Sequence, residues 1–261
     1  LARHGIRGTI THPLRLALFL GAWVGCFFCG FRSILILFLL VFTLQFWLEG
    51  LFRTRIFPAL FAISLLVIAV LLPNTQHLPP VVQRTLSFLP VEIDTATRAS
   101  AESSLQWRLD IWQNLVPEIP RYLWLGKGYA IDPSDLNLAG FDAMRGNTAE
   151  RAIIAGDYHS GPLSLIIPLG FWGAAVVVWF WAATLRFMYW HYRHGNPALK
   201  SANTFLLSLF AARIVFFLLF FGFNYHKWHI IIFEYLSAFF SVSAIAANDY
   251  MVVQLMNFVF H

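Results

Sequence analysis

The chain has 261 residues, of which 59% are hydrophobic and only 12% carry a charged side chain. In average soluble domains roughly a quarter of the residues are charged, so this composition excludes an ordinary soluble domain and indicates an integral membrane protein. The formal net charge of +5 comes mostly from a bias of Lys and Arg toward particular loops, so it gives no reason to expect a nucleic-acid partner.

Six apolar runs approach the roughly 20 residues that a helix needs to cross the hydrocarbon core of a bilayer. The sequence therefore predicts an all-α membrane protein with about six transmembrane helices. Only Arg32 separates the first two runs, so a tight helical hairpin and one long, kinked element both remain open. The runs are Leu14–Phe31, Ser33–Leu48, Phe57–Pro73, Pro162–Leu185, Thr204–Phe223 and Trp228–Ala247.

The start of the chain has none of the features of a signal peptide. It begins at Leu1, and residues 3–13 have the character of a cytoplasmic loop that enters a helix. We therefore expect the chain to be the C-terminal part of a longer protein. Cys26 and Cys29 share one face of the first apolar run, where small buried residues are favoured over a redox pair.

A polar segment, residues 74–160, separates the third run from the fourth and holds ten of the thirteen acidic residues. Loops of this length without structure of their own are uncommon and usually functional. The sequence thus predicts three parts: an N-terminal transmembrane block over 1–73, a loop domain over 74–160 and a C-terminal transmembrane block over 161–261. Each block is expected to contain about three spans.

The distribution of Lys and Arg predicts the orientation, because short cytoplasmic loops carry the excess of positive charge. Eight basic residues lie in the N-terminal segment, in the connection between the second and third apolar runs, and in the connection between the fourth and fifth. These three segments fall on one side of the membrane if the protein has six spans. The loop domain is then expected on the extracytoplasmic side. The eight residues are Arg3, Arg7, Arg15, Arg53, Arg55, Arg186, Arg193 and Lys200.

Within the loop domain, the pattern from about Thr95 to Ile119 predicts a helix, with Ser103 or Ser104 as its N-terminal cap. An apolar stripe repeats along it at intervals of four, three and four residues. Arg108 lies beside this stripe, which places its guanidinium at a membrane surface or at the wall of a cleft. The stripe consists of Leu105, Leu109, Trp112 and Val116.

Four short motifs follow one another along the chain. They are Arg32-Ser33, Arg108-Leu109-Asp110-Ile111-Trp112, Trp124-Leu125-Gly126-Lys127-Gly128, and His159-Ser160-Gly161-Pro162-Leu163 with Gly170 and Gly173 after it. This series resembles the signature of the O-antigen ligase and polymerase superfamily. There an Arg-x-x-x-Trp helix, a Gly-x-Gly turn and a His-Asn-x-x-Leu segment followed by glycines span the large periplasmic loop and the next helix. Ser160 stands where that family has Asn, and Phe31 where it has Ser.

The resemblance implies a glycosyltransferase of the bacterial inner membrane with its large loop in the periplasm. Such enzymes transfer a glycan from a polyprenyl-pyrophosphate carrier to an acceptor hydroxyl without a cofactor or a required metal. The implied partners are a lipid-linked glycan donor and a glycan or lipid acceptor.

This chemistry implies roles for four residues. His159 is expected to be the catalytic base, because imidazole is the side chain that titrates closest to neutral pH. Arg32, Arg108 and Arg213 are expected to bind the pyrophosphate, since a guanidinium stays charged and holds phosphate oxygens with two hydrogen bonds. Arg213 is included because a charge inside a membrane span costs roughly 2.5 to 3.5 kcal/mol on insertion scales and so indicates a functional site.

Structural roles for the same residues remain open. His159 is alternatively an interfacial capping residue, and Arg108 a solvated helix charge. Arg32 alternatively reaches the lipid headgroups from a helix end. Arg213 alternatively pairs with Glu234 on the neighbouring helix.

Two pairs of histidines have a spacing that occurs in metal sites, His191 with His194 and His226 with His229. Each pair lacks a third ligand nearby in the sequence, so no metal site is predicted. For the whole protein, the alternative to an enzyme is a non-catalytic membrane subunit that packs against a larger complex. A transporter is the third hypothesis for the function. It is disfavoured because few ionisable residues lie inside the spans and no pair of broken-helix repeats is visible.

Overall fold

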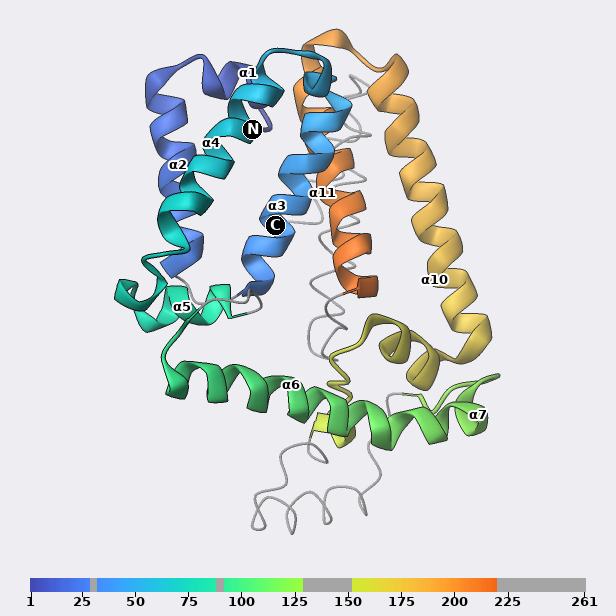
Figure 1. Cartoon of the computed structure of the whole chain (residues 1–261). Coiled ribbons are helices and arrows are strands. Elements are labelled where there is room, and N and C mark those ends of the chain that lie inside the picture. Colours follow the sequence, from blue (N-terminus) through green and yellow to red (C-terminus); the bar gives the residue numbers. More distant parts are fainter. Residues whose placement is uncertain (29–31, 88–91, 129–151, 220–261) are drawn as a thin grey trace, which may run out of the picture.

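The computed structural model describes residues 1–28, 32–87, 92–128 and 152–219, and every regular element in these ranges is a helix. The long apolar helices run along the main axis of the molecule, and α6 lies across one end of them (Figure 1). The long helices are α2 (Pro13–Phe28), α3 (Arg32–Leu48), α4 (Ile56–Leu71), α6 (Thr95–Leu115), α10 (Gly161–His194) and α11 (Lys200–Leu219). The short ones are α1 (Gly5–Ile10), η1 (Leu51–Arg53), η2 (Thr75–His77), α5 (Pro80–Leu86), η3 (Val116–Glu118), α7 (Ile119–Tyr122) and η4 (Pro197–Leu199).

Two helical segments are long and apolar enough to cross a membrane, Gly161–His194 and Pro197–Leu219. α2, α3 and α4 are equally apolar in character but have only 16 or 17 residues each. The predicted all-helical class is thus confirmed for the described residues, whereas the count of six spans stays a prediction. The sixth predicted run, Trp228–Ala247, lies outside the described residues.

α2 and α3 form an antiparallel hairpin held by aromatic contacts. The ring centroid of Trp23 lies 4.9 Å from that of Phe38, and Phe19 lies 5.7 Å from Phe42. Residues later in α2 therefore meet residues earlier in α3, as antiparallel packing requires. The alternative of one long, kinked element is wrong.

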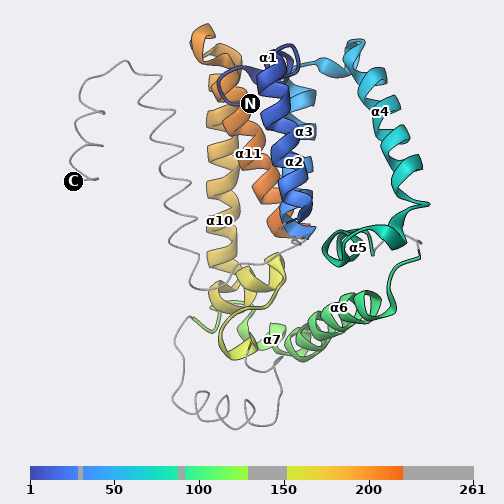
Figure 2. The same ribbon diagram turned by 90° about the vertical axis from the view of Figure 1, so that its left-hand side faces the viewer.

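α11 is the central helix, since it packs against both α3 and α10. Trp181 of α10 meets Phe217 of α11 edge to face, with 5.4 Å between the ring centroids. At the other end of α10, the Tyr192 hydroxyl donates to the Leu48 carbonyl at 2.7 Å, which ties α10 to the end of α3. α4 meets α3 only near its start, where Phe57 lies 6.4 Å from Phe46 between ring centroids, and its remainder diverges from these three helices (Figure 2). No residue of α4 is buried.

The N-terminus of α6 is capped by Asp94, whose carboxylate accepts from the Thr97 amide at 3.0 Å. The sequence-based expectation of a cap at Ser103 or Ser104 is wrong. Both serines lie inside the helix, where their hydroxyls donate to the Ser100 carbonyl at 3.1 and 2.9 Å. Serine readily makes this bond to the preceding turn, and the first free amides of the helix lie two turns earlier, beside the Asp94 carboxylate.

The buried face of α6 carries Ile111 and Leu115, which are 0% and 4% exposed and pack against the first turns of α10. Leu105 and Val116, by contrast, are 56% and 54% exposed. These two residues of the apolar stripe are therefore not part of the face that packs against α10. The side of α6 that is buried is decided by where α10 lies, which the apolar pattern of α6 alone does not show.

α10 is broken near its start. Gly170 has φ +65° and ψ −174°, a conformation that is essentially restricted to glycine, and Pro168 lies within the same stretch. The turns before Gly170 consequently lie at an angle to the long remainder of the helix (Figure 1).

The turn after α7, residues 124–128, supplies hydrogen bonds to the break in α10. The Lys127 amide donates to the Ile167 carbonyl at 2.7 Å, and the Phe171 amide donates to the Leu123 carbonyl at 2.6 Å. Backbone groups that lose their helical partners must be satisfied by other protein groups when they lie at a membrane. The glycine-rich turn therefore fixes the start of α10, and with it the segment just before α10.

Candidate functional site

His159 lies at the junction between the loop and α10 and has a strained backbone. Its φ of +47° makes it the only residue other than glycine with a positive φ in the described ranges. Such a conformation costs of order 1 kcal/mol and persists where the surroundings enforce it. Two residues later, a Cβ on Gly161 would lie 2.1 Å from the Phe217 carbonyl oxygen, so the junction is pressed against the end of α11.

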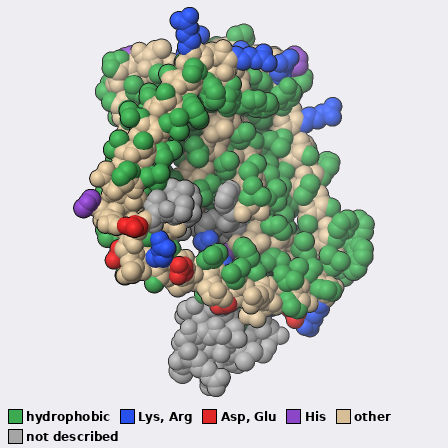
Figure 3. Space-filling model, viewed as in Figure 1, with side chains coloured by type: hydrophobic (Ala, Val, Ile, Leu, Met, Phe, Trp, Pro, Cys, Tyr) green, Lys and Arg blue, Asp and Glu red, His purple; other side chains and the backbone are tan. Residues whose placement is uncertain are grey.

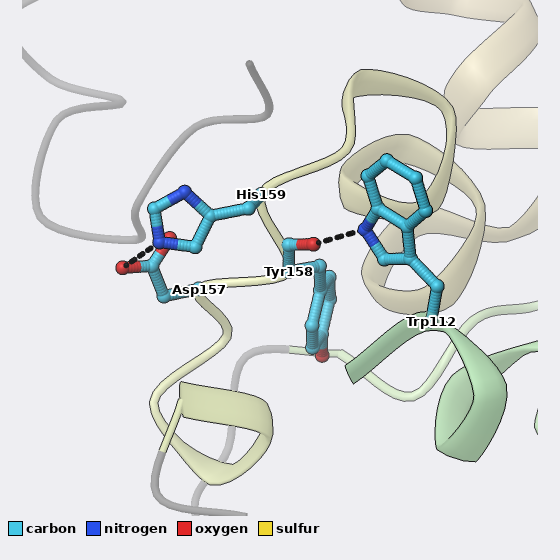
Figure 4. A network of polar contacts seen from close by, with 4 residues as sticks. All are labelled: Trp112, Asp157, Tyr158 and His159. Atoms are coloured by element: carbon cyan, nitrogen blue, oxygen red, sulfur yellow. Dashed lines mark hydrogen bonds and ion pairs between the residues drawn. The ribbon is translucent and has the colours of Figure 1, made fainter. Parts of the chain in front are cut away.

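Asp157 orients the imidazole of His159. Its Oδ2 lies 3.3 Å from Nε2 of the histidine, and both side chains are about one-fifth exposed, at 20% and 19% (Figure 4). When Nε2–H donates to this carboxylate, the basic lone pair of the neutral imidazole is on Nδ1. The arrangement fixes one tautomer and one ring orientation. Sequence analysis did not single out Asp157, although a carboxylate two residues before the histidine was the available signal.

α6 holds the same junction from the other side. Nε1 of Trp112 donates to the Tyr158 carbonyl at 3.0 Å (Figure 4). Tyr158 itself is 6% exposed and packs with Ile111 and Leu115. The tryptophan of the Arg-x-x-x-Trp segment therefore positions the residue that precedes His159.

Arg108 lines a pocket on α6. The pocket has a volume of about 430 Å³ and is lined by Ser103, Ser104, Trp107 and Arg108. Arg108 is partly buried, and this burial lowers the pKa of its guanidinium. Because that pKa starts far above neutral, the group remains a cation and becomes a partly desolvated one. Such a cation is suited to bind an anion.

The pocket and His159 share one neighbouring side chain, Trp107. Its ring lines the pocket and meets the His159 ring edge to face, with 4.9 Å between the centroids. The structure thus brings the residue next to Arg108 into contact with the histidine, although 51 residues separate Arg108 and His159 in the sequence.

A second arginine, which sequence analysis missed, reaches the pocket wall. Nη2 of Arg84, in α5, donates to the Ser104 hydroxyl at 3.4 Å. Arg84 had no recognisable motif around it, and only the packing of α5 beside α6 brings it there. Two guanidinium groups therefore lie at this pocket.

A comparison with protein families agrees with this geometry. The model of the O-antigen ligase family matches residues 16–178, which is more than half of the chain and includes α6, the glycine-rich turn and His159. The chain belongs to the O-antigen ligase family. No curated protein and no solved structure matches it. Membership implies a membrane protein of lipopolysaccharide or polysaccharide biosynthesis that acts on a membrane-associated, lipid-linked glycan.

Two other residues were predicted to belong to the site of this O-antigen ligase family member, Arg32 and Arg213, and the structure says less about them. α3 starts at Arg32, at the end of the molecule that α5 and α6 cover (Figure 1), but the Arg32 side chain is outside the described set. Arg213 lies in α11, one turn before the Phe217 carbonyl that Gly161 approaches. Glu234, its predicted alternative partner, lies outside the described residues. The roles of both arginines stay predictions.

No group of three His, Cys, Asp or Glu residues that could hold a metal occurs within the described ranges. His191 is 7% exposed, and its Nδ1 lies 3.0 Å from the Phe187 carbonyl oxygen, a local contact within α10. His226 and His229 lie outside the described residues.

The burial of Tyr158 leads to a prediction about the stability of the protein at alkaline pH. Burial, with a smaller contribution from Tyr122, raises the pKa of Tyr158 from 10.0 to about 12. Between pH 10 and about pH 12 the folded protein therefore keeps the phenol proton, whereas the unfolded chain releases it. This contribution to stability is fully present below pH 10 and is lost as the pH rises to 12. The loss is about 3 kcal/mol.

Tyr158→Phe should remove this part of the pH dependence. We expect the free energy of unfolding in detergent to fall less between pH 9.5 and pH 11.5 in this variant than in the parent. Tyr189→Phe, which changes an exposed tyrosine of α10, is the matched control. Equal losses in all three proteins would contradict the assignment.

Proposed function

We propose that the chain transfers a glycan from a polyprenyl-pyrophosphate carrier to an acceptor hydroxyl at the periplasmic face of the bacterial inner membrane. One observation carries the proposal: Trp107 contacts His159, which is paired with Asp157, and also lines the arginine pocket. Glycan transfer of this kind needs a base for the attacking hydroxyl and cations for the leaving pyrophosphate, close to each other.

The proposed reaction uses these groups as follows. Nδ1 of His159 takes the proton of the acceptor hydroxyl while the hydroxyl oxygen forms a bond to the anomeric carbon. The bond from that carbon to the pyrophosphate oxygen breaks, and its electron pair leaves with the pyrophosphate. Asp157 stabilises the imidazolium that forms, and Arg108 with Arg84 stabilises the charge on the leaving group. The histidine then releases the proton to solvent.

The charge distribution supports the proposed orientation. On the face drawn in Figure 3, Lys and Arg side chains are seen at both ends, whereas Asp and Glu side chains are seen only toward the end opposite α1. If short cytoplasmic loops carry the positive charge, the end with α5, α6 and the pocket faces the periplasm. The loop domain over 74–160, which separates the two transmembrane blocks in the sequence, is then expected on the periplasmic side. In this proposed orientation, α6 would lie at the membrane face where a lipid-linked donor presents its pyrophosphate.

Arg108→Lys should lower transfer in the complete protein by roughly 10- to 100-fold, the equivalent of one lost hydrogen bond to a charged group. A lysine keeps the charge but cannot hold two phosphate oxygens in a planar fork. The measurement is the rate of glycan transfer from a lipid-linked donor in membranes. Arg121→Lys is the control, because the Arg121 side chain is 73% exposed.

Full transfer by Arg108→Lys would remove this arginine from the site. The alternative function, a non-catalytic subunit of a larger membrane complex, predicts no transfer by the parent protein with any lipid-linked donor. The same assay therefore separates the two functions.

A further inference from the structure

Trp107 has a property that its neighbour Trp112 lacks. Both tryptophans lie on α6 beside the junction. Nε1 of Trp112 is bonded to the Tyr158 carbonyl, whereas Nε1 of Trp107 is buried and has no hydrogen-bond partner within the described part of the chain. Buried indole N–H groups normally find an acceptor. Trp107 therefore combines an indole N–H that lacks an acceptor with a position in the lining of the pocket.

We propose that Trp107 binds the first sugar of the donor glycan, the ring at whose anomeric carbon transfer takes place. The sugar lies against the indole ring and accepts a hydrogen bond from Nε1–H. This inference rests on the proposed function and adds to it the residue that recognises the transferred group.

The connectivity of the donor determines where this sugar must lie. Its anomeric carbon is bonded directly to a pyrophosphate oxygen, so the ring must lie next to the cations of the pocket. The same carbon is attacked by the hydroxyl whose proton goes to His159, so the ring must also lie next to the histidine. The position of Trp107 meets both requirements. Trp107 directly precedes Arg108 in α6, and its ring contacts the ring of His159.

The chemistry of the pocket wall fits a sugar better than a polyprenyl chain. A pyranose has C–H faces that suit an aromatic ring and hydroxyls at its edge that need polar partners. The hydroxyls of Ser103 and Ser104 donate to the Ser100 carbonyl and so present oxygen lone pairs to the pocket. An isoprenoid tail would offer no polar partner to the Ser103 oxygen or to the indole N–H.

The test compares two ligands that share the lipid and the pyrophosphate, polyprenyl pyrophosphate itself and the same lipid carrying its glycan. Binding of each to the purified complete protein is measured together with KM and kcat for transfer. Trp107→Phe keeps an aromatic face but removes the donor, and we expect it to bind the glycosylated lipid roughly 3- to 10-fold more weakly. Trp107→Leu removes both, and roughly 10- to 100-fold weaker binding is expected. Binding of the sugar-free lipid should be unchanged in both variants.

Trp124→Phe is the matched control, since Trp124 is 61% exposed and does not line the pocket. Equal weakening of both lipids by the Trp107 variants would show that Trp107 only supports the pocket wall, and unchanged binding of the glycosylated lipid would also overturn the inference. In either case a parent protein that binds and transfers leaves the proposed function intact. A parent that binds neither lipid would overturn the proposed function and this inference together. If Trp107→Leu does not fold, Trp107→Phe alone decides.

Discussion

His159→Ala in the complete protein is expected to lower glycan transfer by roughly 10²- to 10⁴-fold, the usual contribution of a positioned general base. The loss should appear in kcat, because the base acts on the acceptor hydroxyl in the transition state and does not hold the donor. Expression and membrane insertion should not change, since the imidazole lies at the loop junction against Asp157 and Trp107, outside the apolar cluster between α10 and α11. The measurement is the rate of transfer from a saturating lipid-linked donor in membranes.

The matched control for this variant is His77→Ala. His77 lies in η2, and its side chain is exposed. We expect His77→Ala to transfer at the parent rate. Unchanged transfer by His159→Ala would exclude the histidine from the mechanism, and an equal loss in both variants would indicate a general effect on the loop domain.

Gly170→Ala should have the largest effect on stability. The φ and ψ of Gly170 are essentially restricted to glycine, and a Cβ there would lie 2.6 Å from both the Gly126 amide nitrogen and the Trp124 carbonyl oxygen. Backbone atoms on both sides would have to separate. The hydrogen bonds between the glycine-rich turn and α10 would then be lost. With the conformational cost added, we expect a loss of about 3 to 5 kcal/mol.

Gly128→Ala separates the two contributions to this loss. Gly128 has φ +76°, but among the described residues no atom beyond its chain neighbours lies within 4 Å of its would-be Cβ, so the conformational cost of about 1 kcal/mol is expected alone. The free energy of unfolding of both variants would be measured in detergent from tryptophan fluorescence. Equal stability of Gly170→Ala and Gly128→Ala would contradict the close packing of the turn against α10.

The sequence predicted features that depend on local pattern. The helix expected from about Thr95 forms from Thr95 to Leu115, and two apolar segments on either side of Arg32 pack as a hairpin. The motif that begins with His159 pointed to the junction before α10, because a polar segment followed by Gly-Pro at the start of an apolar run marks a helix start.

Features that depend on contacts between distant segments could not be predicted. Gly170 was noted only as a motif glycine, because its break depends on a turn more than 40 residues earlier. The buried side of α6 depends on α10, and the position of Arg84 depends on how α5 packs beside α6. Asp157 lies two residues before His159 in the sequence, but the sequence does not show that the two side chains are in contact. It also does not show the left-handed φ of His159.

The central claim is that the base and the cations of this site act together on a lipid-linked glycan. It is tested most directly by following both products when the purified complete protein, in lipid vesicles, is supplied with a polyprenyl-pyrophosphate-linked glycan and its acceptor. We expect one polyprenyl pyrophosphate to be released for each glycan joined to the acceptor, with no nucleotide added, and both products to form roughly 10²- to 10⁴-fold more slowly with His159→Ala. Release of polyprenyl pyrophosphate without glycan on the acceptor, or equal product from His159→Ala, would contradict the account.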